Sequence, residues 1–230
     1  MSKSETELDH LLGLLFQAHP WHGVAPGPKP PEIVSAYIEI VPTDAVKYEL
    51  HKSSGLIHID RPQRFSSFCP TLYGFIPQTF CGETVGRLCS ERTGTGGIQG
   101  DGDPMDICVL TEKSVAHGNF LVRAKPIGGL RMIDGIEADD KIIAVLESDV
   151  AYGHLNDITE CPRGVIDRLQ HYFLTYKQLP YEAPRKVEIA GVYNRVEAME
   201  VITRSINDYR TSYGEPAGRL SELRRLLATQ

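Results

Sequence analysis

The sequence lacks the patterns that hold small extracellular proteins or zinc ribbons together. Its five cysteines contain no CxxC pair, and an odd number of cysteines in 230 residues argues against a disulfide framework. No apolar stretch is long enough to span a bilayer, and the N-terminal segment carries acids where a signal peptide carries bases. We therefore expect reduced thiols, a cytoplasmic location and no membrane partner.

Positive charge is also in short supply. Lysine and arginine together number 24 against 30 aspartates and glutamates, which gives a formal charge of −6. This balance argues against nucleic acid as a partner. It leaves room for a small anionic substrate, because local cations or a bound metal can reverse the electric field inside a cleft.

The chain divides into three parts by composition. Residues 1–32 predict a short amphipathic helix, with leucines and Phe16 at helical spacing, followed by a proline-rich arm. Residues 33–210 form the body, and residues 211–230 predict a C-terminal helix. Six glycines within residues 80–100 predict a glycine-rich insertion that forms a long loop or a flexible hairpin. They do not predict a phosphate-binding loop, since Gln99 replaces the third glycine of GxGxxG.

Strand patterns come first in the body and helical patterns later. Residues 35–41, 46–51 and 55–61 alternate between apolar and polar side chains and predict a three-stranded antiparallel meander. Further strands are predicted at 107–112, 119–134 and 139–147, and helices at 164–179 and 196–209. This order indicates an α+β fold in which a small antiparallel β-barrel has helices packed outside it.

The stretch "GDGDPMDICVL", residues 100–110, places three aspartates within six positions. Asp101, Asp103 and Asp106 repel one another unless positive charge lies among them. Mg²⁺ prefers such carboxylate ligands, and Gly102 and Pro104 shape a turn between them. The motif therefore predicts a metal site, although a solvated acidic turn remains the simpler structural alternative.

Two other acidic motifs fit the stretch poorly. An EF-hand loop that starts at Asp101 would place Met105 at its fifth position and Asp106 where a glycine must turn the chain. A DxD phosphatase nucleophile needs an apolar strand before the first aspartate, and a glycine-rich segment stands there instead. A second acidic group, in "RMIDGIEADDK", contains Asp134 and Asp139 and is followed by Lys141.

Taken together with "IEI", "KYEL", "DR", "YGF" and "YK", the motif "DGDPMD" resembles the soluble inorganic pyrophosphatases of the Mg²⁺-dependent barrel type. The matches run in order from about residue 34 to about residue 200. The resemblance implies a closed OB-like barrel, Mg²⁺ as cofactor with Mn²⁺ as the alternative, inorganic pyrophosphate as substrate and a homo-oligomer.

The resemblance also implies a role for each matching residue. Asp101, Asp106 and Asp139 would bind metal, Asp103 and Asp134 would complete the acidic cage, and Glu39 and Glu49 would hold further metal. The groups that would contact phosphate are Lys47, Arg61, Tyr73, Lys141, Tyr176 and Lys177. Asp103 is the candidate base for the attacking water, with Glu49 and Tyr73 as further catalytic candidates.

Simpler structural interpretations stay open for several of these residues. Lys47 and Glu49 could form an ordinary ion pair on a solvated face, and Arg61 could pair with Asp60. The chain also departs from the family at Cys69 in "SFCP", where many relatives have a tyrosine, so that a polar contact is missing or replaced. The segment at residues 80–100 is longer than in compact bacterial relatives.

The resemblance implies that the chain hydrolyses diphosphate to two phosphates by metal-activated water. A non-enzymatic barrel that binds a divalent ion or a nucleotide, or a less specific phosphohydrolase, is the alternative. Four converging basic side chains distinguish the enzyme from the binding module, because a module that only binds an ion has no use for them.

Overall fold

The structure of the chain, a computed structural model, describes residues 17–179, 181, 187–215, 218, 221 and 225. The helix predicted around Leu8 lies outside the described residues, as does most of the predicted C-terminal helix. Residues 211–213 of that segment belong instead to the helix before it, α4 (Arg195–Tyr213). No helix among the described residues is long and apolar enough to cross a membrane.

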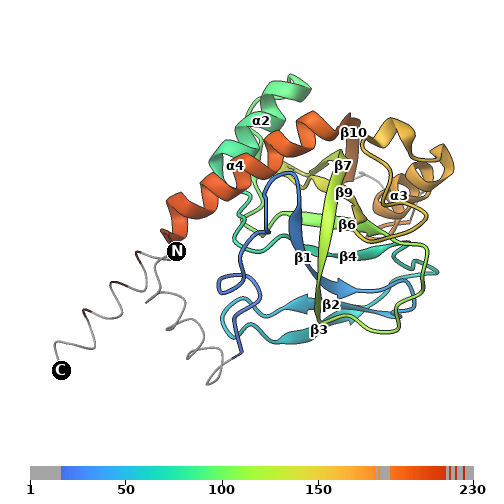
Figure 1. Ribbon diagram of the computed structural model, residues 1–230. Coiled ribbons are helices and arrows are strands. Elements are labelled where there is room, and N and C mark those ends of the chain that lie inside the picture. Colours follow the sequence, from blue (N-terminus) through green and yellow to red (C-terminus); the bar gives the residue numbers. More distant parts are fainter. Residues whose placement is uncertain are drawn as a thin grey trace.

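Five strands pair with one another in a ring (Figure 1). Each strand finds a neighbour on both sides, since β1 pairs with β4, β4 with β6, β6 with β9, β9 with β7, and β7 again with β1. Every pairing is antiparallel except that of β6 with β9, which is parallel. The five strands are β1 (Val34–Ile40), β4 (Leu72–Phe75), β6 (Asp106–Leu110), β7 (Phe120–Asp134) and β9 (Lys141–Leu146).

The second half of β7 extends beyond this ring and carries three further strands. β10 (Val187–Asn194) pairs with it along one edge, and β8 (Glu137–Ala138) folds back on it. β5 (Gln99–Gly100) then pairs with β8 in parallel. The predicted α+β class with a ring of mainly antiparallel strands is confirmed. The two parallel pairings, β6 with β9 and β5 with β8, were not predicted.

The predicted three-stranded meander is wrong in one respect. β2 (Val46–Leu50) and β3 (Ile57–Pro62) pair as a separate two-stranded hairpin, and β1 is not a member of that sheet. The physical reason is that both edges of β1 are already occupied by β4 and β7. Alternation predicted the strands correctly, but it carries no information about which edges are free.

The glycine-rich segment is not the predicted loop, because it contains the helix α2 (Glu83–Thr93). Its glycines mark the helix ends: Gly82 is the N-cap residue, and Gly94 ends the helix in the left-handed conformation with φ of 71°. Gly86 lies inside the helix, where a Cβ would come within 2.7 Å of the backbone of Gly100. The prediction used the number of glycines and not their spacing, and it therefore missed a helix with one buried face.

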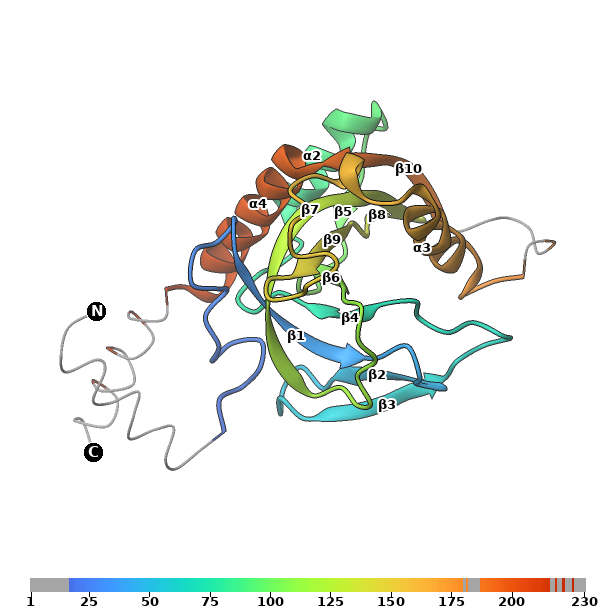
Figure 2. The same cartoon turned by 45° about the vertical axis from the view of Figure 1, so that its right-hand side comes forward.

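Helices cover the strands on two sides (Figure 2). α2 and α4 lie side by side, and α3 (Arg163–Thr175) lies apart from them beyond β10, preceded by the 3₁₀ turn η1 (Ile158–Glu160). The helices predicted at 164–179 and 196–209 are thereby confirmed.

Alternation along the strands divides the core between these helices. Ile107 and Val109 of β6 pack in one cluster with residues of α2 and α4, whereas Cys108 and Leu110 pack in another with residues of α3. Successive side chains of a strand point to opposite faces. Asp106 therefore lies on the same face as Cys108, on the side of the ring that α3 covers.

Candidate active site

All thirteen residues singled out from the sequence line one cavity of about 660 Å³. They are spread over positions 39 to 177 of the sequence, so that only the fold brings them together. The residues are Glu39, Lys47, Glu49, Arg61, Tyr73, Asp101, Asp103, Asp106, Asp134, Asp139, Lys141, Tyr176 and Lys177.

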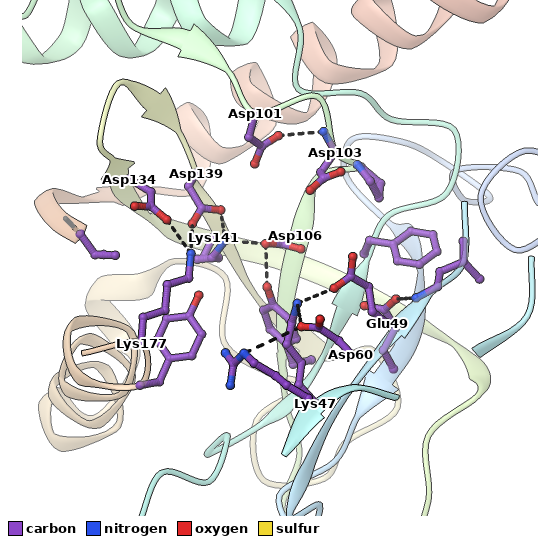
Figure 3. Close-up of a pocket in the computed structure, with 18 of the residues that line it drawn as sticks. Lys47, Glu49, Asp60, Asp101, Asp103, Asp106, Asp134, Asp139, Lys141 and Lys177 are labelled. Atoms are coloured by element: carbon purple, nitrogen blue, oxygen red, sulfur yellow. Dashed lines mark hydrogen bonds and ion pairs between the residues drawn. The ribbon is translucent and has the colours of Figure 1, made fainter. Parts of the chain in front are cut away.

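The centre of the cavity is formed by Asp106, Asp139 and Lys141, which we call the floor. Asp106 and Lys141 are register partners in the parallel β6–β9 ladder, and the Lys141 Nζ lies 2.5 Å from an Asp106 oxygen. The same amine also donates to Asp139 (Figure 3). Burial opposes the charge of Lys141, but the two carboxylates outweigh it and hold the pKa of the amine well above its usual range.

Tyr73 supports the floor from the neighbouring strand. It lies on β4, beside β6, and its hydroxyl donates a hydrogen bond of 2.6 Å to Asp106. Burial, together with the charge of Asp106, raises the pKa of the phenol well above its ordinary value. Tyr73 thus stays protonated and holds one oxygen of Asp106 in a fixed direction.

The turn before β6 brings Asp101 and Asp103 to the cavity. Gly102 has a φ of 76°, which favours glycine, and the Asp103 N–H donates to the Asp101 carboxylate over 2.9 Å. The backbone of Cys81 holds this turn from outside, accepting from the Gly102 N–H and donating to the Asp103 carbonyl. The turn is therefore anchored to the segment that leads into α2.

The second acidic group supplies Asp134 and Asp139 to the cavity. The Lys177 Nζ lies 2.6 Å from Asp134 and 3.9 Å from Asp139, and it reaches them from the end of α3 (Figure 3). Tyr176 is the C-cap residue of α3 and is largely buried beside Lys177. Asp140 does not take part, because it faces Arg131 at 3.6 Å behind the strand.

The β2–β3 hairpin forms the opposite side of the cavity. We call its five charged cavity residues the rim: Lys47, Glu49, Lys52, Asp60 and Arg61. Lys47 lies between two carboxylates, 2.5 Å from Glu49 and 3.0 Å from Asp60, and Arg61 lies 3.8 Å from Asp60. The ion pairs proposed as a simpler interpretation are thus present, and they stand inside the cavity rather than on a featureless face.

Among the described residues, the buried Glu39 and the half-buried Asp101 form no ion pair with a cationic side chain. Burial raises the pKa of Glu39 to about 8 although its carboxylate accepts the Leu50 N–H. Burial and the charge of Asp139 raise the pKa of Asp101 to about 8. An added cation would favour the charged form of both groups.

The donor set also fits a hard divalent cation. Eight carboxylate side chains line the cavity, and carboxylate oxygens are the ligands that Mg²⁺ prefers. Within the described part of the chain, no three acids, histidines or cysteines already converge at metal-binding spacing. The cause is visible at the floor and beside it, where the amines of Lys141 and Lys177 stand between the carboxylates.

Nine of the residues that line the cavity were not candidates from the sequence, and three charged side chains and one tryptophan among them bear on the site. These four are Trp21, Lys52, Asp60 and Arg64. Asp60 and Arg64 flank the predicted Arg61, and Lys52 directly follows the predicted strand at 46–51, so proximity to a candidate was the only available signal. Trp21 belongs to the arm, and no pattern connected that arm to a site in the body.

Cys69 lies outside the cavity. Its side chain is buried in the cluster that contains Cys108 and α3, and burial raises the pKa of its thiol to about 11. The position where many relatives carry tyrosine therefore contributes packing here and no polar group to the site.

The family model of inorganic pyrophosphatases matches residues 36–210. The chain belongs to the inorganic pyrophosphatase family. It is 52% identical over 196 residues to the inorganic pyrophosphatase of Chlamydia trachomatis serovar L2, a match that covers 84% of this chain and 94% of the relative. A soluble inorganic pyrophosphatase of Zea mays is 37% identical over 84% of this chain and 79% of its own length.

The fold agrees with this family. The crystal structure of the Thermus thermophilus inorganic pyrophosphatase matches with a TM-score of 0.69 and 31% identity, over 84% of this chain and 99% of that one. Inorganic pyrophosphatases are metal-dependent enzymes that hydrolyse diphosphate. The OB-like architecture predicted from the sequence is confirmed.

Proposed function

We propose that this member of the inorganic pyrophosphatase family hydrolyses diphosphate in the cavity between the floor and the rim. The observation that carries the proposal is the meeting of eight carboxylates and six cationic side chains in one cavity. Diphosphate is a highly charged anion that repels an attacking anion, so its charge has to be offset before reaction. The two kinds of side chain divide this task.

The carboxylates would hold the metal. We assign Asp101, Asp106 and Asp139 as ligands, with Asp103 and Asp134 completing the cage and Glu39 and Glu49 as further ligands. Mg²⁺ is the proposed cofactor and Mn²⁺ the alternative; when bound, either supplies positive charge that offsets the charge of the substrate and acidifies water.

The cationic side chains would hold the phosphates. Lys47 and Arg61 approach from the rim, while Lys141 and Lys177 approach from the floor and the end of α3. Tyr176 and Tyr73 offer hydroxyl groups on the same side. Contacts from two opposite sides fix the orientation of a small anion. Such positioning contributes much of the rate enhancement of phosphoryl transfer.

Asp103 is the proposed base or orienting acceptor for the attacking water. Its side chain is about half exposed, in contrast to Asp106 and Asp139, and the turn fixes its backbone. An open carboxylate can accept a proton and pass it to solvent. The attack would be in line, with Arg61, Lys177 and Tyr176 stabilising the departing phosphate, and no covalent intermediate is needed.

Phosphate release tests this function. The purified chain is assayed with Mg²⁺ and inorganic diphosphate, ATP or p-nitrophenyl phosphate as separate substrates. We expect release from diphosphate well above the other two, loss of activity with a chelator and recovery with added Mg²⁺. Activity on ATP or the aryl phosphate alone would favour a general phosphohydrolase, and no activity at all would favour the binding module.

A homo-oligomer and a cytoplasmic location belong to the same proposal. They are supported by the family and by the reduced thiols expected of five cysteines with no pair among them. Light scattering on the purified chain measures the first, and fractionation of cells that express the chain measures the second.

A further inference from the structure

The segment His19–His22 lies before the residues that the family model matches, yet it reaches the cavity. Trp21 lines the cavity together with Lys52 and Asp103, and its side chain is 2% exposed. The sequence predicted only a short helix and a proline-rich arm for residues 1–32. The contacts of the segment show which part of the site it touches.

The body holds this segment by several directed hydrogen bonds. The Trp21 Nε1–H donates to the Thr79 carbonyl over 2.8 Å, and the Gln78 N–H donates to the Trp21 carbonyl over 2.9 Å. The ring of His22 bonds to the Tyr209 hydroxyl of α4 over 2.8 Å. Bonds to two separate parts of the body fix the segment as a rigid wall.

His19 connects this wall to the β2–β3 turn. Its Nε2 lies 3.0 Å from the Lys52 carbonyl, and a carbonyl can only accept, so Nε2 carries the hydrogen. The other ring nitrogen, Nδ1, accepts from the N–H groups of Trp21 and His22. One neutral imidazole thereby joins the arm and the turn.

The turn also packs tightly against the arm. Gly55 adopts a φ of 72°, and a Cβ at this position would come within 2.8 Å of the His19 ring and 3.1 Å of Pro20. Only glycine allows so close an approach. The position of Lys52, three residues earlier in the turn, is therefore set by the arm.

Lys52 extends from this turn to Asp103, the proposed base, and forms an ion pair with it. The two side chains are 51% and 46% exposed, and exposed ion pairs contribute little to stability. The pair is therefore better suited to holding the Asp103 carboxylate in one direction than to stabilising the fold.

We propose that Lys52 is a positioning residue for Asp103 and that the segment His19–His22 positions Lys52. This inference rests on the proposed function of Asp103. A misplacement of about 1 Å at a reacting group can cost about 100-fold in rate. The effect acts on the chemical step, so kcat should respond and KM should change little.

Steady-state kinetics with diphosphate and Mg²⁺ test the pair. We expect Lys52→Ala to lower kcat roughly tenfold, within the range that misplacement allows, with KM nearly unchanged. Lys52→Arg keeps the charge and should retain most of the rate. Lys113→Ala, in which the replaced lysine is 80% exposed and pairs with Glu112, is the matched control. An unchanged kcat in Lys52→Ala overturns the inference, and so does a raised KM at unchanged kcat.

A double variant tests the role of the arm. We expect His19→Ala to lower kcat by less than Lys52→Ala does. The double variant should match Lys52→Ala within about twofold, because both changes act through the same Lys52–Asp103 ion pair. If the fold-decrease in kcat of the double variant equals the product of the two single decreases, His19 acts independently of Lys52, which contradicts the proposal. His154→Ala controls for the loss of an imidazole, because this histidine is exposed and its ring forms no hydrogen bond within the described part of the chain.

Fluorescence gives a readout that does not depend on turnover. Trp21 is the single tryptophan of the chain, so its emission reports on this wall of the cavity alone. Binding of imidodiphosphate, a non-hydrolysable analogue, should change the emission of the unmodified chain. Calorimetric binding without any such change would overturn the placement of the arm in the site. An unmodified chain that releases no phosphate would instead defeat the proposed function.

Discussion

The floor and the rim carry the same kinds of charged group, but the chain holds them in different ways. The floor amine of Lys141 is 2% exposed and lies in a ladder of the central ring, whereas the rim lysines Lys47 and Lys52 are 27% and 51% exposed on a hairpin outside that ring. Buried charges are costly unless their partners are fixed, and exposed ones are cheap to move. The floor is therefore preorganised, whereas the rim around Lys47, outside the Lys52–Asp103 pair that the arm positions, can adjust to the substrate.

This contrast gives the two sides separate signatures. Changes at the floor should affect stability and turnover together, because the charges there also hold the core. Changes at the rim should affect binding or turnover with little change in stability. Variants at each side test whether the floor and the rim differ in this way.

The largest effect is expected for Asp103→Asn. The amide keeps the shape of the side chain and loses its basicity, so kcat should fall by about 10²- to 10⁴-fold, the usual contribution of a general base. Circular dichroism and the midpoint of urea unfolding should stay unchanged, since the carboxylate is half exposed. Turnover near that of the unmodified chain would remove Asp103 from its proposed role.

Lys141→Met should separate the floor from the rim by stability. It leaves Asp106 and Asp139 without their shared amine, and breaking a buried ion pair typically costs about 3–5 kcal/mol. We expect a lower free energy of unfolding in urea without added metal, together with loss of turnover. If stability is unchanged while turnover is lost, the floor is no more preorganised than the rim.

Lys47→Ala is the matching change at the rim. Its two ion pairs are partly exposed, so the free energy of unfolding should fall by no more than about 1 kcal/mol. The loss of a phosphate contact should raise KM for diphosphate, which initial-rate measurements report. A stability loss as large as that of Lys141→Met would abolish the distinction between the two sides.

The smallest effect is expected for Cys69→Ala. The thiol lies in the cluster beneath α3 and outside the cavity, so turnover should stay within about twofold of the unmodified chain, as for most changes remote from a site. Stability should fall slightly because buried volume is lost. A large drop in kcat would show that Cys69 does take the place of the polar contact seen in relatives.

The sequence revealed the chemistry of the site better than its architecture. Three aspartates within six residues are detectable because their repulsion needs an explanation, and local alternation revealed most strands. The partner of β1 was not detectable, since strand pairing depends on which edges other segments occupy. The residues of α2 were obscured because glycines at helix ends resemble those of a loop.

The same limit explains the residues missed at the site. Lys52 and Trp21 acquire their positions from contacts with segments distant in the sequence, at Asp103 and Thr79. A single lysine in a turn, or a tryptophan in a proline-rich arm, has no local pattern that distinguishes it from a surface or packing residue. Only the fold places them beside the motif.

A crystal grown with Mn²⁺ and imidodiphosphate would show whether metal and phosphate bind together in this cavity. We expect metal density among Asp101, Asp106 and Asp139, with phosphate oxygens in contact with Lys47 from the rim and with Lys141 or Lys177 from the other side. Metal and analogue bound elsewhere, with these three carboxylates turned to solvent, would contradict this expectation.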